Sequence, residues 1–110
     1  MLLGLRTAIY PAPDLARAKV FYRDLLGVEP YFDQPFYVGF AVGGFELGLL
    51  PDAQPGAAGP QPLWGVSHAD SAWQRLLALG ATALEPVHDV GEGIRVAAVL
   101  DPFGNRLGII

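Results

Sequence analysis

The chain of 110 residues contains no cysteine, few charged residues and no long apolar run. The absence of cysteine excludes disulfide bonds, zinc ribbons, iron–sulfur clusters and thiol catalysis. Seven basic residues stand against eleven acidic ones, so the net charge of −4 would on average repel a nucleic-acid backbone. The longest uncharged apolar stretch, residues 35–45, is far shorter than a membrane span. Nucleic acid and membrane are therefore not expected as partners.

What is present indicates one folded domain over residues 1–110. Hydrophobic residues make up 52% of the chain and charged residues only 16%, which supplies a core and argues against disorder. The first ten residues lack the charged start and long apolar run of a signal peptide, so we expect a cytoplasmic protein. The 14 glycines and 10 prolines cut the chain into short segments, which favours strands.

The first half of the chain has the pattern of a strand, a helix and three further strands. Residues 3–10 are apolar and include β-branched side chains, and prolines follow them. Asp14 can cap a helix over residues 15–26, where apolar residues recur every three or four positions, and Gly27 can end it. Three strand-like runs come next, the last two joined by a Gly-Gly turn, at residues 29–32, 36–42 and 45–50.

The second half repeats this order after a Pro- and Gly-rich linker, residues 51–62. A short strand is predicted at 63–66, and a helix at 69–80 that Ser67 or Asp70 can cap. Further strands are predicted at residues 82–87, 94–100 and 106–110. The repeated order indicates an internal duplication. The expected fold class is α+β, with two β-α-β-β-β modules (about residues 1–50 and 63–110) whose mixed sheets form a cup with the helices outside.

Several short motifs occur in a familiar order and spacing. Asp14-Leu15 precedes a helix that contains Phe21-Tyr22, and the chain ends with Asp101-Pro102-Phe103-Gly104-Asn105. Together with the hairpin into residues 45–49, these motifs resemble the vicinal oxygen chelate superfamily, which includes glyoxalases, bleomycin-resistance proteins and extradiol dioxygenases. The resemblance covers essentially the whole chain. It implies a homodimer and a ligand cavity between the sheets.

The resemblance also implies four positions at which metal-dependent members carry ligands. Here they fall on residues that are poor ligands or have no side chain, namely Thr7, Gly48, Gln61 and Gly108. We therefore expect no cofactor, and a protein that binds a small molecule without a metal. Glycine in the two strands would leave steric room for that molecule, or would merely mark bulges or a crowded dimer seam.

Six residues are expected to line this cavity: Thr7, Glu46, Gly48, Gln61, Arg95 and Gly108. Glu46 would be a general base or the partner of a cationic ligand, with its pKa raised by burial. It would be an ordinary exposed residue if the strand register differs by one. Arg95 would bind an anionic ligand, pair with Glu46, or point into solvent.

The histidines and aromatic residues each allow two interpretations. His68 fits a surface or capping position, and His88, in a loop, would be either solvated or a general acid–base at the cavity mouth. The strand aromatics would stack on a planar ligand, or would pack in the core or at a subunit interface. They are Phe32, Phe36, Tyr37, Phe40, Phe45, Trp64 and Phe103.

Two other functions remain open. One is a glyoxalase-like lyase or isomerase, or a dioxygenase, in which Glu46 and His88 hold a divalent metal ion in an atypical site. The other is a dimeric module with a vestigial cavity. If the protein only binds a ligand, no catalytic residue is expected. If it is an enzyme, Glu46 is the candidate catalytic residue.

Overall fold

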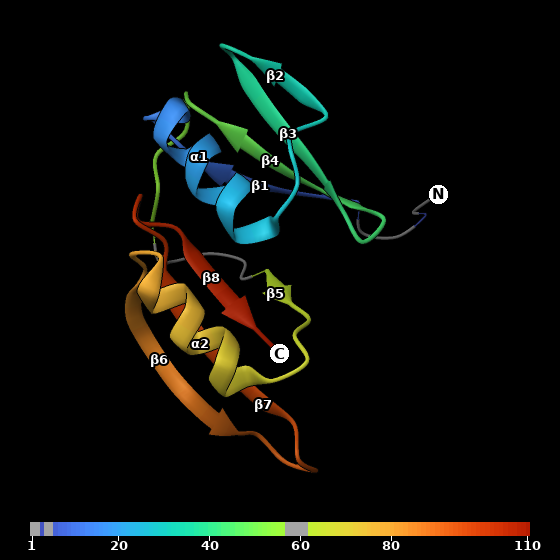
Figure 1. Ribbon diagram of the computed structural model, residues 1–110, viewed down its shortest axis with the longest axis vertical. Coiled ribbons are helices and arrows are strands. Elements are labelled where there is room, and N and C mark those ends of the chain that lie inside the picture. Colours follow the sequence, from blue (N-terminus) through green and yellow to red (C-terminus); the bar gives the residue numbers. More distant parts are fainter. Residues whose placement is uncertain (1–2, 4–5, 57–61) are drawn as a thin grey trace. The chain divides into compact units, whose positions relative to one another are not determined.

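The computed structural model describes residue 3 and residues 6–56 and 62–110. Gln61 and part of the expected linker lie outside the described residues. The chain divides into two compact units, residues 1–55 and 56–110. Each unit consists of a four-stranded mixed sheet and one helix, as Figure 1 shows. The α+β class and the β-α-β-β-β order of each half are thus confirmed.

The sheet of the first unit has the strand order β1-β4-β3-β2. Only β1 and β4 pair in parallel, and the other neighbours are antiparallel. The elements are β1 (Thr7–Pro11), α1 (Leu15–Leu26), β2 (Phe32–Gln34), β3 (Tyr37–Val42) and β4 (Phe45–Leu50).

The ends of α1 and the β3–β4 hairpin form as their residue types predict. The Asp14 side chain accepts a hydrogen bond from the Arg17 backbone N–H at 3.3 Å. Gly27 ends the helix with φ 72°, and Gly43 and Gly44 turn β3 into β4 with φ 57° and 84°. Glycine suits all three places because other residues are strained at positive φ.

The core of the first unit lies between α1 and one face of its sheet. Tyr22 on α1 is fully buried and packs edge-on against Tyr10 of β1, with ring centroids 5.8 Å apart. Every second residue of β3 and β4 is buried on this face, namely Val38, Phe40, Leu47 and Leu49. This alternation leaves the intervening residues on the face opposite α1, which we call the open face of the first sheet.

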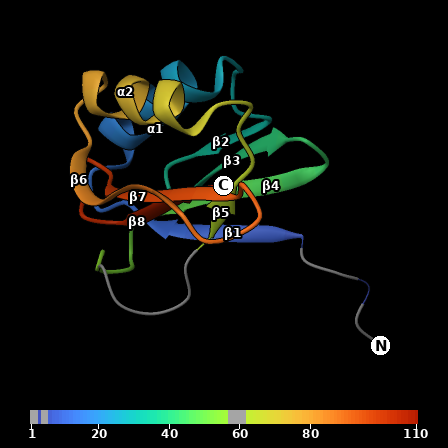
Figure 2. The same cartoon turned by 90° about the horizontal axis from the view of Figure 1, so that it is seen from below.

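The second unit repeats the design with the strand order β5-β8-β7-β6. In Figure 2, α2 lies over the sheet of this unit. The buried core residues include Leu76 on α2, Val99 on β7 and Leu107 on β8. The elements are β5 (Leu63–Trp64), α2 (Ala69–Ala78), β6 (Thr82–Asp89), β7 (Arg95–Leu100) and β8 (Arg106–Ile109).

Two local expectations for this unit are wrong. Neither Ser67 nor Asp70 caps α2, because the N-cap position is His68, which makes no side-chain capping bond. His88 lies in a strand rather than a loop, because β6 stays paired with β7 as far as Asp89, with two register shifts along the way.

The turn between β7 and β8 is built on a buried carboxylate. Asp101 Oδ1 accepts hydrogen bonds from the backbone N–H groups of Phe103, at 2.9 Å, and Asn105, at 2.8 Å. The Asn105 side chain donates to Asp101 Oδ2 at 3.1 Å. This side-chain network holds the turn that the motif Asp101–Asn105 predicts.

None of the helices in the described part of the chain is long and apolar enough to span a membrane.

Candidate functional site

The register of the first sheet brings polar residues and glycines together on its open face. Thr7 of β1 pairs with Glu46 of β4, and Gly48 pairs with Ile9 on one side and with Gly39 on the other. Because residues two apart in a strand share a face, Glu46 and Gly48 lie on the same side of the sheet. The register therefore places Glu46 on the open face.

Glu46 is the centre of a hydrogen-bonded cluster. The Thr7 hydroxyl donates to Glu46 Oε1 at 2.8 Å. The Tyr31 phenol, in the bend before β2, donates to Glu46 Oε2, and the Tyr37 phenol of β3 also bonds this carboxylate. The Arg6 guanidinium lies 3.4 Å from the Thr7 hydroxyl oxygen. We call Thr7, Tyr31, Tyr37 and Glu46 the Glu46 cluster.

The hydroxyl donors keep Glu46 ionised. The Tyr31 hydrogen bond lowers the pKa of Glu46 most, and burial opposes it, but Thr7, Tyr37 and the Arg6 charge add to the lowering. The raised pKa expected from burial is therefore not found, because hydrogen bonds to the charged form outweigh desolvation. At neutral pH this group is a stable anion rather than a proton acceptor.

The same interactions keep both phenols protonated. The Glu46 hydrogen bond is the main cause that raises the pKa of Tyr31. Burial, followed by the charge of Glu46, raises the pKa of Tyr37 to about 12. Both tyrosines are therefore neutral hydrogen-bond donors at neutral pH.

Two glycines make room for the cluster. A Cβ atom on Gly48 would overlap the Tyr37 hydroxyl oxygen and would lie 2.7 Å from Ile9 Cδ1. A Cβ atom on Gly39 would lie 2.8 Å from Glu46 Oε2. The space over Gly48, which we expected to hold a ligand, is thus filled by the Tyr37 phenol. Glycine is needed at both places because another side chain approaches the backbone closely.

Aromatic rings extend the open face beside the cluster. The ring of Phe32 lies 6.5 Å from that of Tyr31 and 6.0 Å from those of Phe36 and Tyr37, between centroids. Tyr31 is 59% exposed and Phe36 is 62% exposed. A ligand on this face would therefore meet a carboxylate bordered by accessible aromatic surface.

The remaining predicted site residues lie in the second unit or outside the described residues. Arg95 lies in the second unit, where its guanidinium pairs with Asp70 of α2 at 3.4 Å. Gly108 is buried in the middle of the second sheet, between Leu63 and Ala98. Because Arg95 and Ala98 are an odd number of residues apart, Arg95 and Gly108 lie on opposite faces. Gln61 lies outside the described residues.

The other titratable candidate is also in the second unit. His88 is exposed on β6, and its Nδ1 lies 2.8 Å from the Pro86 carbonyl oxygen. Its neighbour across the ladder is Val96 of β7. None of these contacts indicates a role in proton transfer.

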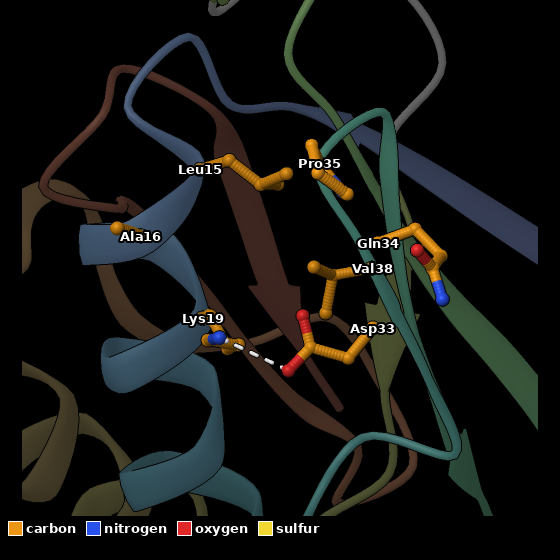
Figure 3. Close-up of a pocket in the computed structure, with 7 residues that line it drawn as sticks. All are labelled: Leu15, Ala16, Lys19, Asp33, Gln34, Pro35 and Val38. Atoms are coloured by element: carbon orange, nitrogen blue, oxygen red, sulfur yellow. Dashed lines mark hydrogen bonds and ion pairs between the residues drawn. The ribbon is translucent and has the colours of Figure 1, made fainter.

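A separate pocket of about 350 Å³ lies on the α1 side of the first sheet (Figure 3). Lys19 and Asp33, two of its lining residues, form an ion pair at 3.0 Å. Its other lining residues are Leu15, Ala16, Gln34, Pro35 and Val38. None of them belongs to the Glu46 cluster.

Tyr31 and Tyr37 are members of the site that the sequence did not predict as partners of Glu46. The sequence predicted Tyr37 only as one of several strand aromatics, and it gave no prediction for Tyr31. The available signal was the alternation Tyr37-Val38-Gly39, which places a phenol and a glycine on one strand face. It points to Glu46 only once β3 and β4 are paired.

The fold and these motifs define a family, and comparison with known proteins identifies it. Residues 4–109 match the sequence model of the Glyoxalase/Bleomycin resistance protein/Dioxygenase superfamily. The chain therefore belongs to this superfamily. A search of curated proteins found no match.

Solved structures of the same fold are similar over nearly the whole chain. A glyoxalase-related enzyme from Fulvimarina pelagi is 21% identical, with a TM-score of 0.80, over 98% of this chain and 87% of that one. Lactoylglutathione lyase from Agrobacterium tumefaciens is 24% identical, with a TM-score of 0.78, over 99% and 93%. TioX from Micromonospora sp. ML1 is 22% identical, with a TM-score of 0.76, over 96% of both. At these identities the likeness establishes the fold alone.

The three implied metal positions among the described residues do not fit a divalent ion. Thr7 donates its hydroxyl to Glu46, Gly48 lies under the Tyr37 phenol, and Gly108 has no side chain. Within the described ranges, no three His, Asp or Glu side chains gather as a ligand set. Divalent ions in such proteins require several nitrogen or oxygen ligands. We therefore derive no step through a metal ion.

Proposed function

We propose that this protein binds a small organic molecule on the open face of the first sheet, over the Glu46 cluster, without the help of a metal ion. The observation that carries the proposal is the convergence of three hydroxyl groups on one carboxylate, on the sheet face opposite α1. Ordered polar groups bordered by apolar surface are typical of ligand sites.

The arrangement divides the work of binding between two kinds of side chain. The hydroxyls of Thr7 and Tyr31 hold both carboxylate oxygens of Glu46 in fixed positions, so a ligand meets a preorganised polar group. The exposed rings of Tyr31 and Phe36, with Phe32 between them, offer apolar area for a flat ligand. The ligand would therefore be oriented by its polar end and held mainly by ring contact.

An enzymatic function is favoured less by these contacts. The lowered pKa of Glu46 makes it a weak base at neutral pH, and the His88 ring contacts the Pro86 carbonyl oxygen of its own strand. Lactoylglutathione lyase and the glyoxalase-related enzyme share the fold only, and fold alone does not determine activity.

The test is a binding screen with a positional readout. Fragments of positive, negative and no charge are screened by thermal shift, and each hit is mapped by backbone amide chemical shifts. We expect hits to perturb the amides of β1, β3 and β4 near the Glu46 cluster. Hits confined to the α1 pocket, or no hits in any charge class, would contradict the proposal.

The metal content of the purified protein provides the accompanying control. Elemental mass spectrometry on untagged protein, prepared without chelators, should find no stoichiometric divalent metal. Near-stoichiometric Ni, Zn, Fe or Mn would instead support the lyase or dioxygenase alternative.

A further inference from the structure

We infer that the molecule bound at the Glu46 cluster is an organic cation, of the class of alkyl-substituted ammonium ions. The inference rests on the proposed function and specifies the ligand of that same site. It is drawn from the charge of Glu46, from the groups that surround it, and from the rings beside it.

The negative charge of Glu46 is held but not neutralised. Its hydrogen-bond donors, Thr7, Tyr31 and Tyr37, are all uncharged. Among the described residues of the first unit, no Lys or Arg nitrogen forms an ion pair with Glu46. The charge of Arg6 acts on Glu46 from a distance, and its guanidinium contacts the Thr7 hydroxyl. A carboxylate accepts about four hydrogen bonds, so three donors still leave room for a contact with a ligand. The cluster therefore presents an ordered anion to a ligand.

Two other strand carboxylates lack this property, and the third, Asp89, lies opposite Arg95 in the β6–β7 ladder. Asp33 pairs with Lys19, and Glu85 pairs with Arg106. In those two pairs the opposite charge comes from the protein itself, so neither pair calls for a cationic ligand. Glu46 has no such ion-pair partner in the described part of its own unit, so a cation that comes with the ligand can pair with it.

The neighbouring rings select the kind of cation. The faces of aromatic rings attract cations within about 6 Å, most strongly when the cation is poorly hydrated. The rings of Tyr31, Phe32 and Phe36 form a connected group, and the Tyr31 hydroxyl is bonded to Glu46 itself. An alkylammonium ion contacts rings and carboxylate together, whereas a small inorganic cation would retain its water and gain little from the rings. An anion would be repelled by both.

The experiment compares two molecules of equal shape and different charge. Choline is the cationic probe, and 3,3-dimethyl-1-butanol, in which carbon replaces the ammonium nitrogen, is its neutral match. Both are titrated into isotopically labelled protein, and binding is followed by the amide shifts of residues near the Glu46 cluster. We expect choline to bind in the millimolar range and the alcohol to bind roughly tenfold more weakly.

Three variants assign the effect to particular side chains. Glu46→Gln should weaken choline binding roughly tenfold and leave the binding of the alcohol unchanged. Phe32→Leu should weaken choline binding roughly threefold, as expected for an exposed ring–cation contact. Asp33→Asn removes the same charge on the α1 side of the same sheet and should leave choline binding unchanged. Amide spectra of the free variants show whether each one is folded.

The outcomes separate this inference from the proposed function. Equal binding of choline and the alcohol, or equal choline binding by Glu46→Gln and the parent protein, overturns the cation inference. Neutral or anionic fragments that bind this face while choline does not would leave the proposed function standing and the inference wrong. If no molecule of any charge perturbs this face, both fail.

Discussion

The two units share a backbone design and differ in the side chains of one sheet face. In the first unit, Gly48 of β4 pairs with β1 on one side and with β3 on the other. In the second, Gly108 of β8 pairs in the same manner with β5 and β7. The pairing makes Gly48 and Gly108 equivalent. Two residues before each glycine, the chain carries Glu46 in one unit and Arg106 in the other.

The two units therefore share their strand ladder but not the chemistry of its side chains. Gly48 pairs with Gly39 of β3, and Gly108 pairs with Ala98 of β7. Two residues before these partners, β3 carries Tyr37 and β7 carries Val96, so the second unit has no phenol at the equivalent position. Arg106 is paired with Glu85, whereas Glu46 is held by neutral hydroxyls. The units therefore have different electrostatic character on equivalent strands, and the candidate site belongs to the first.

The hairpins also differ, and the largest expected effect concerns them. Asp101 holds the β7–β8 turn with a buried side chain, whereas the β3–β4 turn depends on two glycines with positive φ. Asp101→Ala should lower the free energy of unfolding by about 1–3 kcal/mol, because buried N–H groups lose their acceptor. Urea denaturation measures this. Gly44→Ala, the comparison in the first unit, should cost about 1 kcal/mol from backbone strain. An Asp101→Ala effect below that of Gly44→Ala would contradict the assigned role of the carboxylate.

Crowding over Gly48 gives the next effect. Gly48→Ala should destabilise the protein by about 1–2 kcal/mol and displace Tyr37 from Glu46, because the added Cβ meets the phenol. Gly48→Ala should cost less stability in a protein that already carries Tyr37→Ala than in the parent protein, because the phenol that the added Cβ meets is then absent. Denaturation of the four proteins forms a double-mutant cycle. Additive losses would show that the two residues do not interact.

The charge of Glu46 should be visible in the tyrosine titrations. In Glu46→Gln the pKa of Tyr31 should fall most, because the Glu46 hydrogen bond is its main cause of elevation. The pKa of Tyr37 should fall from about 12 but stay above 10, because burial is its main cause. Ring-labelled tyrosine NMR from neutral to alkaline pH resolves each group. Unchanged titration of Tyr31 would disprove the contact.

The same variant should have a flatter dependence of stability on pH. The lowered pKa of Glu46 contributes stability that is present above its ordinary pKa of 4.5 and is lost as the pH falls. The raised pKa of Tyr37 contributes stability that is present below pH 10 and is lost as the pH rises toward about 12. Glu46→Gln should lose less stability at both extremes. Denaturation midpoints across the pH range test this, with Asp33→Asn as the charge-matched control.

The smallest effect is expected at Arg95. Its pair with Asp70 is exposed, at 47% and 76% of the two side chains, so Arg95→Ala should cost less than about 0.5 kcal/mol. Arg106 is only 22% exposed in its pair with Glu85, and Arg106→Ala should cost more. Urea denaturation of both variants ranks them, and the reverse order would contradict this comparison.

Much of the fold was predictable from local residue types. Asp14 and Gly27 lie at the two ends of α1, and Gly43-Gly44 form the β3–β4 turn. Such features are predictable because a helix cap or a positive φ depends on only one or two residues. The end of β6 was not predictable, because that strand continues as long as β7 offers partners. A strand end is set by its neighbour, which one segment does not specify.

The candidate site was predictable only in part. Thr7, Glu46 and Gly48 were expected together, and the register places them on one face. Arg95 was expected to bind an anionic ligand, to pair with Glu46 or to point into solvent, and its exposed guanidinium pairs with Asp70, a partner that the sequence did not predict. The pKa of Glu46 was expected to rise because its burial could be inferred from a strand, whereas its hydroxyl partners could not.

Local pattern was enough to specify helices, turns, the repeated β-α-β-β-β order and the superfamily, because each depends on residues close in sequence or on short motifs. Tertiary structure alone decided that Tyr31 and Tyr37 meet Glu46, and that the Tyr37 phenol fills the space over Gly48. These contacts depend on the pairing of β3 with β4. A shift of that register by one residue would turn every side chain of the strand to the other face.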